Sequence, residues 1–138
     1  METYSLFMIK PNATKKNKIG EILAFVEKHG FEIMALKMIE MDEAFAEYFY
    51  GEHKGKSFFE RLIKFMSSGK TVTAVLKREG GVPYLREIIG STDPNEAKEG
   101  TIRKLYADDV THNAVHASDS VEHARDEIKK IFKDFKFE

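Results

Sequence analysis

Short apolar runs of strand length alternate along this chain with stretches whose apolar residues recur at helical spacing, and this alternation restricts the fold more than any other feature. Strands are predicted at residues 4–9, 31–41, 71–76 and 113–117. Strands and helices that alternate without a repeat or a linker indicate helices packed against one sheet. The sequence therefore predicts an α/β (α+β) sandwich.

The helices are marked by apolar spacing and by residues suited to helix ends. The first has apolar residues at i, i+3, i+4 and i+7 and a C-capping glycine, which are Ile19, Ile22, Leu23, Val26 and Gly30. Residues 42–68 predict two helices or a helical hairpin, and residues 82–89 predict a short helix. The last helix has an apolar stripe of Val121, Ala124, Ile128, Ile131, Phe132 and Phe135, with its N-cap in Ser118-Asp119-Ser120.

The order of these elements predicts a ferredoxin-like β-α-β-β-α-β core, in which helices cover a four-stranded antiparallel sheet. The chain has 138 residues, of which 42% are apolar and 33% charged, as expected for one globular domain spanning residues 1–138. Residues 90–109 carry Gly, Pro, Asn and Asp without a clear period. A connection of this length is often functional.

Composition excludes several classes of function. The formal net charge of −1 gives no overall field for nucleic acid or membranes, so any anion site must be built from locally converging basic residues. Cysteine is absent, which removes disulfides and thiolate nucleophiles. No apolar run approaches the roughly 20 residues of a membrane helix, and the start of the chain does not resemble a signal peptide. We therefore expect a cytoplasmic protein with no membrane association and no specific nucleic-acid partner.

His116 is the main candidate for chemistry, because it ends a predicted strand just before a capped helix N-terminus, a position that favours phosphate. A nucleophilic imidazole must be neutral at the attacking nitrogen, and an acceptor on its other N–H fixes the tautomer. Either Ser118 or Glu127 could be that acceptor, since Glu127 lies nearer the apolar stripe than the other acids of its helix. The alternatives are a structural histidine and a solvated Glu127 beside Lys130.

The segment Asn113-Ala114-Val115-His116-Ala117-Ser118-Asp119 resembles the active-site signature of the nucleoside diphosphate kinases. The likeness extends over nearly the whole chain, through four further segments in the same order. These are Ile9-Lys10-Pro11, Phe58-Phe59, Gly90-Ser91-Thr92-Asp93-Pro94 and Gly100-Thr101-Ile102-Arg103. Chance agreement at five separated places is remote.

The resemblance implies a role for each matching residue. His116 is similar to the family's phosphorylated nucleophile, held by Ser118 and Glu127, with Tyr50 packed beside it. The residues implied to bind phosphate are Lys10, Arg86, Thr92 and Arg103. Phe58 is similar to the aromatic residue on which the base stacks, aided by Leu62 and Val110. Asn113 and Lys10 are similar to the residues that hold the ribose hydroxyls. Mg²⁺ is expected to arrive on the nucleotide phosphates, with no metal ligands from protein side chains. Otherwise the basic residues are solvated surface and Phe58 belongs to the core, as we expect for Phe59.

The implied reaction is ping-pong transfer of the γ-phosphate from a nucleoside triphosphate such as ATP to a nucleoside diphosphate such as GDP, through a phosphohistidine on His116. The family's assembly implies a homo-oligomer, a tetramer or hexamer built from dimers, with residues 90–109 at both the nucleotide site and subunit contacts. The rivals are a nucleotide-binding or nucleic-acid-binding regulator on the same scaffold and a hydrolase in which His116 activates water. Four places depart from the common family pattern: Asn12-Ala13, Phe49, Ser57 and Ala117.

Overall fold

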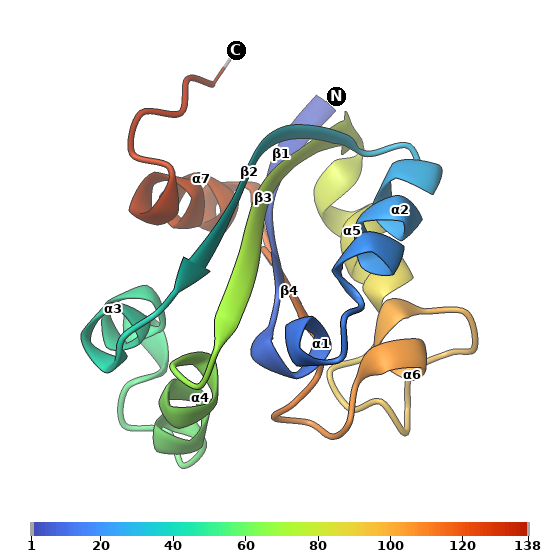
Figure 1. Cartoon of the computed structure of the whole chain (residues 1–138). Helices are drawn as coiled ribbons and strands as arrows, with labels where there is room; N and C mark the ends of the chain where they lie inside the picture. The colour runs from blue at the N-terminus through green and yellow to red at the C-terminus, as the bar shows by residue number, and fades with distance from the viewer. Residues whose placement is uncertain (1, 138) are drawn as a thin grey trace.

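One antiparallel sheet, with its strands in the order β2-β3-β1-β4, organises the computed structural model, which describes residues 2–137 (Figure 1). The strands are β1 (Glu2–Ile9), β2 (Glu32–Glu40), β3 (Lys70–Glu79) and β4 (Val115–Ala117). The helices are α1 (Pro11–Lys15), α2 (Ile19–Lys28), α3 (Glu43–Phe49), the 3-10 turn η1 (Gly51–His53), α4 (Phe59–Met66), α5 (Gly81–Ile89), α6 (Ile102–Tyr106) and α7 (Val121–Ile131). The predicted ferredoxin-like core with a four-stranded antiparallel sheet is confirmed.

Helices cover both faces of the sheet, because the central strand β1 is apolar on each side. Phe7 and Ile9 point into a core shared with α2 and α5, whereas Leu6 and Met8 point into a second core shared with α3, α4 and α7. Figure 1 shows these two helical layers on opposite sides of the strands. The end of β1 therefore lies deep between two layers, where it delivers Lys10.

The structure contains two short helices that the sequence patterns did not predict. Helix α1 starts at Pro11, whose fixed φ suits the first turn of a helix. Helix α6 lies within residues 90–109 and starts after Thr101, whose hydroxyl accepts a hydrogen bond from the Lys104 N–H. Each has five residues, too few to show a helical period in the sequence.

Two predicted boundaries were too generous. The last strand starts at Val115, not at residue 113, because Ala114 has a φ of 73°, which takes it out of the extended region. Helix α7 ends at Ile131, and Phe135 lies beyond it, where its ring packs edge-on against Tyr4 at 5.5 Å. The apolar stripe therefore continues past the helix as a tail packed on the sheet.

The strand that carries His116 is tied to β1 beyond the end of their short ladder. The Ser118 N–H donates to the Leu6 carbonyl at 3.2 Å, and the Leu6 N–H donates to the Ser118 hydroxyl oxygen at 3.0 Å. Both residues are fully buried, so these bonds are shielded from water. This pair extends the register of β4 on β1 and fixes the position of His116.

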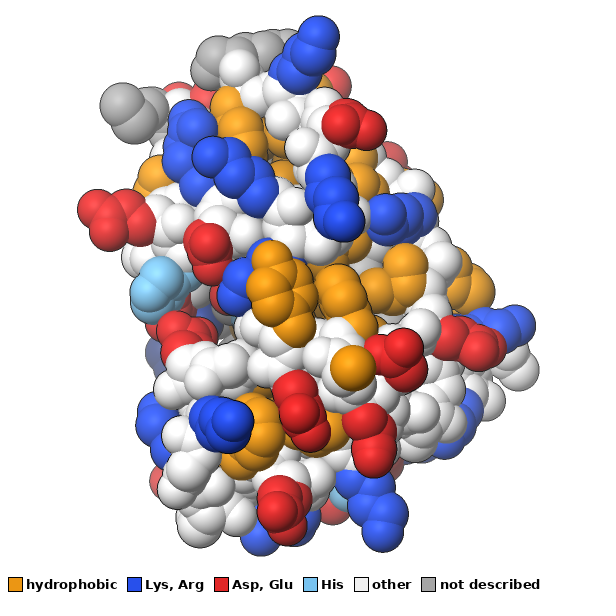
Figure 2. Space-filling model, turned by 90° about the vertical axis from the view of Figure 1, so that its left-hand side faces the viewer, with side chains coloured by type: hydrophobic (Ala, Val, Ile, Leu, Met, Phe, Trp, Pro, Cys, Tyr) orange, Lys and Arg blue, Asp and Glu red, His pale blue; other side chains and the backbone are white. Residues whose placement is uncertain are grey.

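The face that carries α3 and α7 shows Lys and Arg side chains interspersed with Asp and Glu around a group of apolar side chains (Figure 2). Among the described residues, no helix is long and apolar enough to cross a membrane.

Candidate active site

His116 lies on the edge strand β4, directly opposite Met8 of β1, and therefore faces the layer that contains α7. Its Nε2 lies 2.9 Å from Oε1 of Glu127, which α7 presents to the sheet. The Ser118 hydroxyl donates to the same carboxylate oxygen at 2.8 Å. The side chains of His116 and Glu127 are only 18% and 12% exposed. The two candidate partners of His116 thus form a chain of hydrogen bonds, in which Ser118 is bonded to Glu127 and Glu127 is bonded to the imidazole ring.

The environment of Glu127 keeps it in the charged form. Burial raises the pKa of the Glu127 carboxyl, but the His116 ring and the hydrogen bonds from His116 and Ser118 outweigh it, so the pKa lies below its ordinary value. An ionised carboxylate on Nε2 requires a proton on that nitrogen and leaves Nδ1 with its lone pair. Among the described residues, no hydrogen bond occupies Nδ1. The arrangement therefore prepares Nδ1 as a nucleophile.

Two aromatic rings confine the imidazole. The rings of Phe49 and Tyr50 both stand edge-on to His116, with centroids at 5.8 and 6.4 Å. The Tyr50 hydroxyl is buried and has no hydrogen-bond partner among the described residues. Burial, with a smaller contribution from the Glu127 charge, raises the pKa of Tyr50 far above its ordinary value, so the phenol stays protonated. It is a neutral donor with an unused proton beside the histidine.

His116 opens into a cavity of about 580 Å³ that gathers residues distant in the sequence. The lining residues are Lys10, Tyr50, His53, Ser57, Phe58, Arg61, Leu62, Arg86, Thr92, Arg103, Val110, Thr111, Asn113, His116 and Ala117. Every residue predicted for the nucleotide site lines it, while Ser118 and Glu127 lie behind His116. The structure therefore brings the predicted site together in one place.

Three cations converge near His116. Arg103 is 7% exposed and donates to the carbonyls of Gly90 and Val115, each at 3.0 Å, while its Nε has no partner among the described residues. Burial, and then the charge of Arg86, lowers the pKa of Arg103 to about 10. Arg86 donates to the Ala117 carbonyl at 3.2 Å. Both guanidinium groups are thus held by backbone carbonyls next to the histidine, and Arg86 also interacts electrostatically with the Asp119 carboxylate.

Lys10 is the third cation and the most deeply buried. Its Nζ donates to Oδ1 of Asn113 at 2.9 Å, and the residue as a whole is only 6% exposed. Burial, and then the charge of Arg103, lowers the pKa of Lys10 to about 7. The buried amine of Lys10 is hydrogen-bonded to a neutral side chain rather than to an anion. A negatively charged ligand in the cavity would therefore stabilise its charged form.

The other part of the cavity is apolar and partly open to solvent. Phe58 is 37% exposed, and Val110 is 55% exposed, with Leu62 half-buried between α4 and the cavity. Phe59, the next residue, is 9% exposed and belongs to the core. An exposed aromatic ring beside aliphatic side chains is suited to stacking on a planar ligand.

Five cavity residues were not predicted as part of the site: His53, Ser57, Arg61, Thr111 and Ala117. Arg61 could have been found from its place three residues after Phe58, which puts both side chains on one face of α4. Thr111 could have been found from its place between Val110 and Asn113. His53 packs against the Phe58 ring, with ring centroids 5.4 Å apart. No pattern in the sequence predicts this contact.

The departures from the family pattern are accommodated locally. Ala117 does not have a positive φ; that conformation falls on Ala114, whose carbonyl accepts from the Lys10 N–H at 2.8 Å. Asn12 donates through Nδ2 to Asp108 Oδ2 at 3.1 Å and to the His112 carbonyl at 3.0 Å, which ties α1 to the segment before β4. Phe49 packs directly on His116. None of these positions removes a predicted site residue from the cavity.

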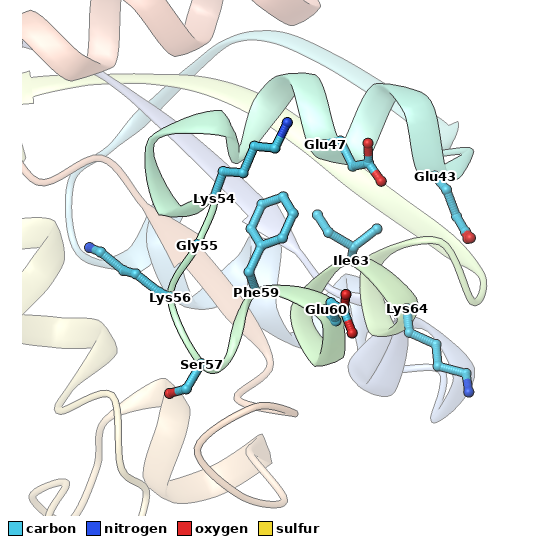
Figure 3. A pocket seen from close by; sticks show the side chains of 10 residues that line it. All are labelled: Glu43, Glu47, Lys54, Gly55, Lys56, Ser57, Phe59, Glu60, Ile63 and Lys64. Atoms are coloured by element: carbon cyan, nitrogen blue, oxygen red, sulfur yellow. The ribbon is translucent and has the colours of Figure 1, made fainter.

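A larger hollow of about 810 Å³ lies between α3 and α4 and shares only Ser57 with the cavity that contains His116. Figure 3 shows Phe59 and Ile63 between the two helices, with Glu43 and Glu47 on one side and charged residues of α4 on the other. No catalytic histidine or phosphate-binding cation of the predicted site lines it. Within residues 2–137, no group of three or more His, Asp and Glu side chains is arranged to hold a metal ion.

Comparison with known proteins agrees with this geometry. The family model described as nucleoside diphosphate kinase matches residues 3–137. A nucleoside diphosphate kinase of Methanocaldococcus jannaschii is 46% identical over 134 residues, which cover 97% of this chain and 96% of that protein. One of Sulfurisphaera tokodaii is 48% identical over 127 residues, 92% of this chain and 86% of that protein.

Solved structures agree as well. The crystal structure of the Aquifex aeolicus nucleoside diphosphate kinase superposes with a TM-score of 0.93 at 42% identity, covering 96% of both chains. That of the Encephalitozoon cuniculi enzyme gives 0.92 at 32% identity, covering 96% of this chain and 90% of the other. Because the family model matches almost the whole chain, the chain belongs to the nucleoside diphosphate kinase family.

Proposed function

We propose that His116 Nδ1 carries the phosphate in the ping-pong reaction that is general to this family, the transfer of the γ-phosphate of a nucleoside triphosphate to a nucleoside diphosphate. The observation that carries this proposal is the Ser118–Glu127–His116 chain of hydrogen bonds, which leaves Nδ1 facing a cavity lined with cations. A structural histidine has no need of a buried carboxylate on one nitrogen and an open cationic cavity beside the other.

In the first half-reaction, the Nδ1 lone pair attacks the γ-phosphorus in line with the bond to the leaving oxygen. The N–P bond forms as the P–O bond breaks, and the diphosphate leaves with the bonding electron pair. The imidazole becomes cationic, and Glu127 stabilises it through the proton that stays on Nε2. In the second half-reaction, a terminal oxygen of an acceptor diphosphate attacks the same phosphorus, the N–P bond breaks, and its electron pair returns to Nδ1, which restores the neutral ring.

The cations supply the electrostatic part of catalysis. Arg86, Arg103 and Lys10 would neutralise the charge that spreads over the phosphoryl oxygens, and the Tyr50 hydroxyl has a free proton to donate beside them. The family generally needs a divalent cation, and we infer that here it is Mg²⁺ carried by the nucleotide phosphates. That assignment fits a cavity whose lining contains Lys, Arg and neutral side chains and no carboxylate.

The proposal is tested by incubating the protein with γ-labelled ATP and Mg²⁺, removing the nucleotide and analysing the label on the chain. We expect an acid-labile, base-stable label that added GDP collects as labelled GTP. Continuous release of free phosphate without an acceptor would show instead that His116 activates water. Absence of any label would contradict the phosphohistidine, and tight nucleotide binding without transfer would favour a regulator.

Glu127→Gln is expected to lower the rate of phosphoenzyme formation by about 10- to 100-fold, because the amide cannot stabilise the cationic ring. The measurement is a single-turnover quench-flow experiment with labelled ATP. Glu122→Gln, an exposed acid on the same helix, is the matched control and should leave the rate unchanged. A rate for Glu127→Gln equal to that of the control would show that the carboxylate only supports the fold.

Nucleotide binding is expected to be coupled to proton uptake at Lys10. The folded-state pKa of about 7 lies below the ordinary value of 10.5, so the free protein is largely uncharged at Lys10 above neutral pH. A bound anion favours the charged amine and raises its pKa, so binding at about pH 8 should take up close to one proton. Calorimetry of ADP binding in buffers with different ionisation enthalpies measures that uptake. Lys10→Met should abolish it, and an unchanged uptake in this variant would assign the proton to another group.

We also propose that the protein acts in the cytoplasm as a homo-oligomer built from dimers, a tetramer or a hexamer. The edge strand β2 supports assembly, since Leu36 and Met38 are 51% and 50% exposed on a strand whose outer edge is unpaired among the described residues. Light scattering coupled to gel filtration gives the mass in solution. A monomer at micromolar concentration would contradict this assignment.

A further inference from the structure

The cavity that contains His116 has two ends, and each opens into a different neighbouring hollow. One end shares Arg86, Thr92 and Arg103 with a hollow of about 480 Å³ beside Gly90. The other end shares Arg61 and Thr111 with a hollow of about 540 Å³. Because the first end holds the phosphate-binding guanidinium groups, Arg61 lies toward the end where the other part of a nucleotide must sit.

Arg61 stands next to the surface on which a base would stack. It lies on α4, three residues after Phe58 and directly before Leu62, so its side chain emerges from the same face of the helix as the Phe58 ring. Arg61 is exposed, and it makes no hydrogen bond or ion pair with any residue between 2 and 137. Its guanidinium is therefore available to a ligand on Phe58, in contrast to Arg86 and Arg103, which are held by carbonyls.

We propose that Arg61 is a specificity-determining residue that contacts the edge of the bound base and favours guanine over adenine. The proposal rests on the nucleotide-transfer function proposed above. A guanidinium has only donors, arranged as a planar fork. Guanine presents two neighbouring acceptors, O6 and N7, which match that fork, whereas adenine replaces O6 by an amino group that donates. Stacking on Phe58 grips all bases alike, so a donor at the base edge is what distinguishes them.

The competing explanation is that Arg61 acts only by its charge. A charge that attracts the phosphates would help every nucleotide equally, because the phosphates are common to all of them. The phosphate end already contains Arg86 and Arg103, and Arg61 lines the hollow at the opposite end. Its effect should therefore depend on the base, and on the two acceptors in particular.

The test measures kcat/KM for GDP, IDP, ADP and CDP as acceptors, with one common donor, in the wild type, Arg61→Ala and Arg61→Lys. We expect Arg61→Ala to lower kcat/KM for GDP and IDP by about fivefold and to change the values for ADP and CDP less than twofold, since an exposed contact is weaker than a buried bidentate pair. Arg61→Lys keeps the charge but loses the fork, and should resemble the alanine variant. Lys129→Ala, which removes an exposed cation on α7 that lines neither the cavity nor the hollow beside Arg61, is the matched control.

Three other outcomes would overturn the proposal. An equal loss for all four acceptors, restored by Arg61→Lys, would show general electrostatic attraction. A loss for GDP but not for IDP would place the contact at the 2-amino group, which a guanidinium cannot accept from. No change for any acceptor would show that Arg61 does not touch the base. Failure of the wild type to form a phosphoenzyme would reject the proposed function instead, before any variant is compared.

Discussion

His116→Ala is expected to lower nucleotide-dependent phosphate transfer by roughly four orders of magnitude or more, because no other group in the cavity can replace an imidazole nitrogen as nucleophile. The other nearby histidine, His53, has no carboxylate hydrogen-bonded to its ring; it lies near Lys56 at 3.4 Å and Glu52 at 3.7 Å. Burial lowers the pKa of His53, and the lone pair of its Nδ1 already accepts from the Lys56 ammonium. The variant should retain nucleotide affinity, since the cations remain in place.

The measurement combines phosphoenzyme trapping with steady-state transfer from ATP to GDP. His123→Ala is the control, since His123 is an exposed histidine on α7 that pairs with Asp119 and lies outside the cavity. We expect label on the wild type and on the control and none on His116→Ala. Label that survives on His116→Ala would move the carrier to another residue, and circular dichroism of the variant establishes that its fold is intact.

Arg103→Ala is expected to have the second largest effect, and it should lower both kcat and the free energy of unfolding. Loss of the guanidinium removes a charge next to His116 and is expected to lower kcat by about 100-fold. It also leaves the Gly90 and Val115 carbonyls without their partner, which should lower the free energy of unfolding by about 2 kcal/mol. The two effects share a cause, because the same side chain joins residues 90–103 to β4.

Arg103→Lys separates these effects. A lysine keeps the positive charge but cannot bond both carbonyls, so we expect it to recover part of kcat and little of the stability. Lys104→Ala removes a neighbouring exposed cation and serves as the control. Urea unfolding and steady-state kinetics on the same preparations give both quantities. Equal recovery of activity and stability by Arg103→Lys would show that the carbonyl contacts are unimportant.

The sequence predicted the parts of the fold and site that depend on local patterns. Strands and long helices followed from apolar spacing, whereas the helical stripe of α7 left the direction of Glu127 open and only the family resemblance directed it toward His116. The resemblance added Lys10, Arg86 and Phe58, and the cavity contains all three. Such features repeat within a few residues, so they are visible before the chain is folded.

The rest depends on contacts between distant parts of the chain. Nothing near Gly90 reveals that its φ is 92° or that a Cβ there would lie 2.6 Å from the Thr101 hydroxyl, a close approach that only glycine permits. Helix α6 was not predicted because it has only five residues. Its capping residue, Thr101, takes up its position only when residues 90–103 fold back on themselves. The positive φ of Ala114 likewise accompanies a contact between distant residues, the hydrogen bond from the Lys10 N–H to the Ala114 carbonyl.

The bonds between Leu6 and Ser118 join residues that are 112 positions apart along the chain. During synthesis on the ribosome, the strand that contains Leu6 emerges early and waits for its partner until 112 further residues have been added. Glu127 emerges later still, so a nascent chain has no oriented histidine however much of its sheet has formed. His116 can therefore be oriented only after α7 has emerged, and fragments truncated before α7 should be inert toward nucleotides.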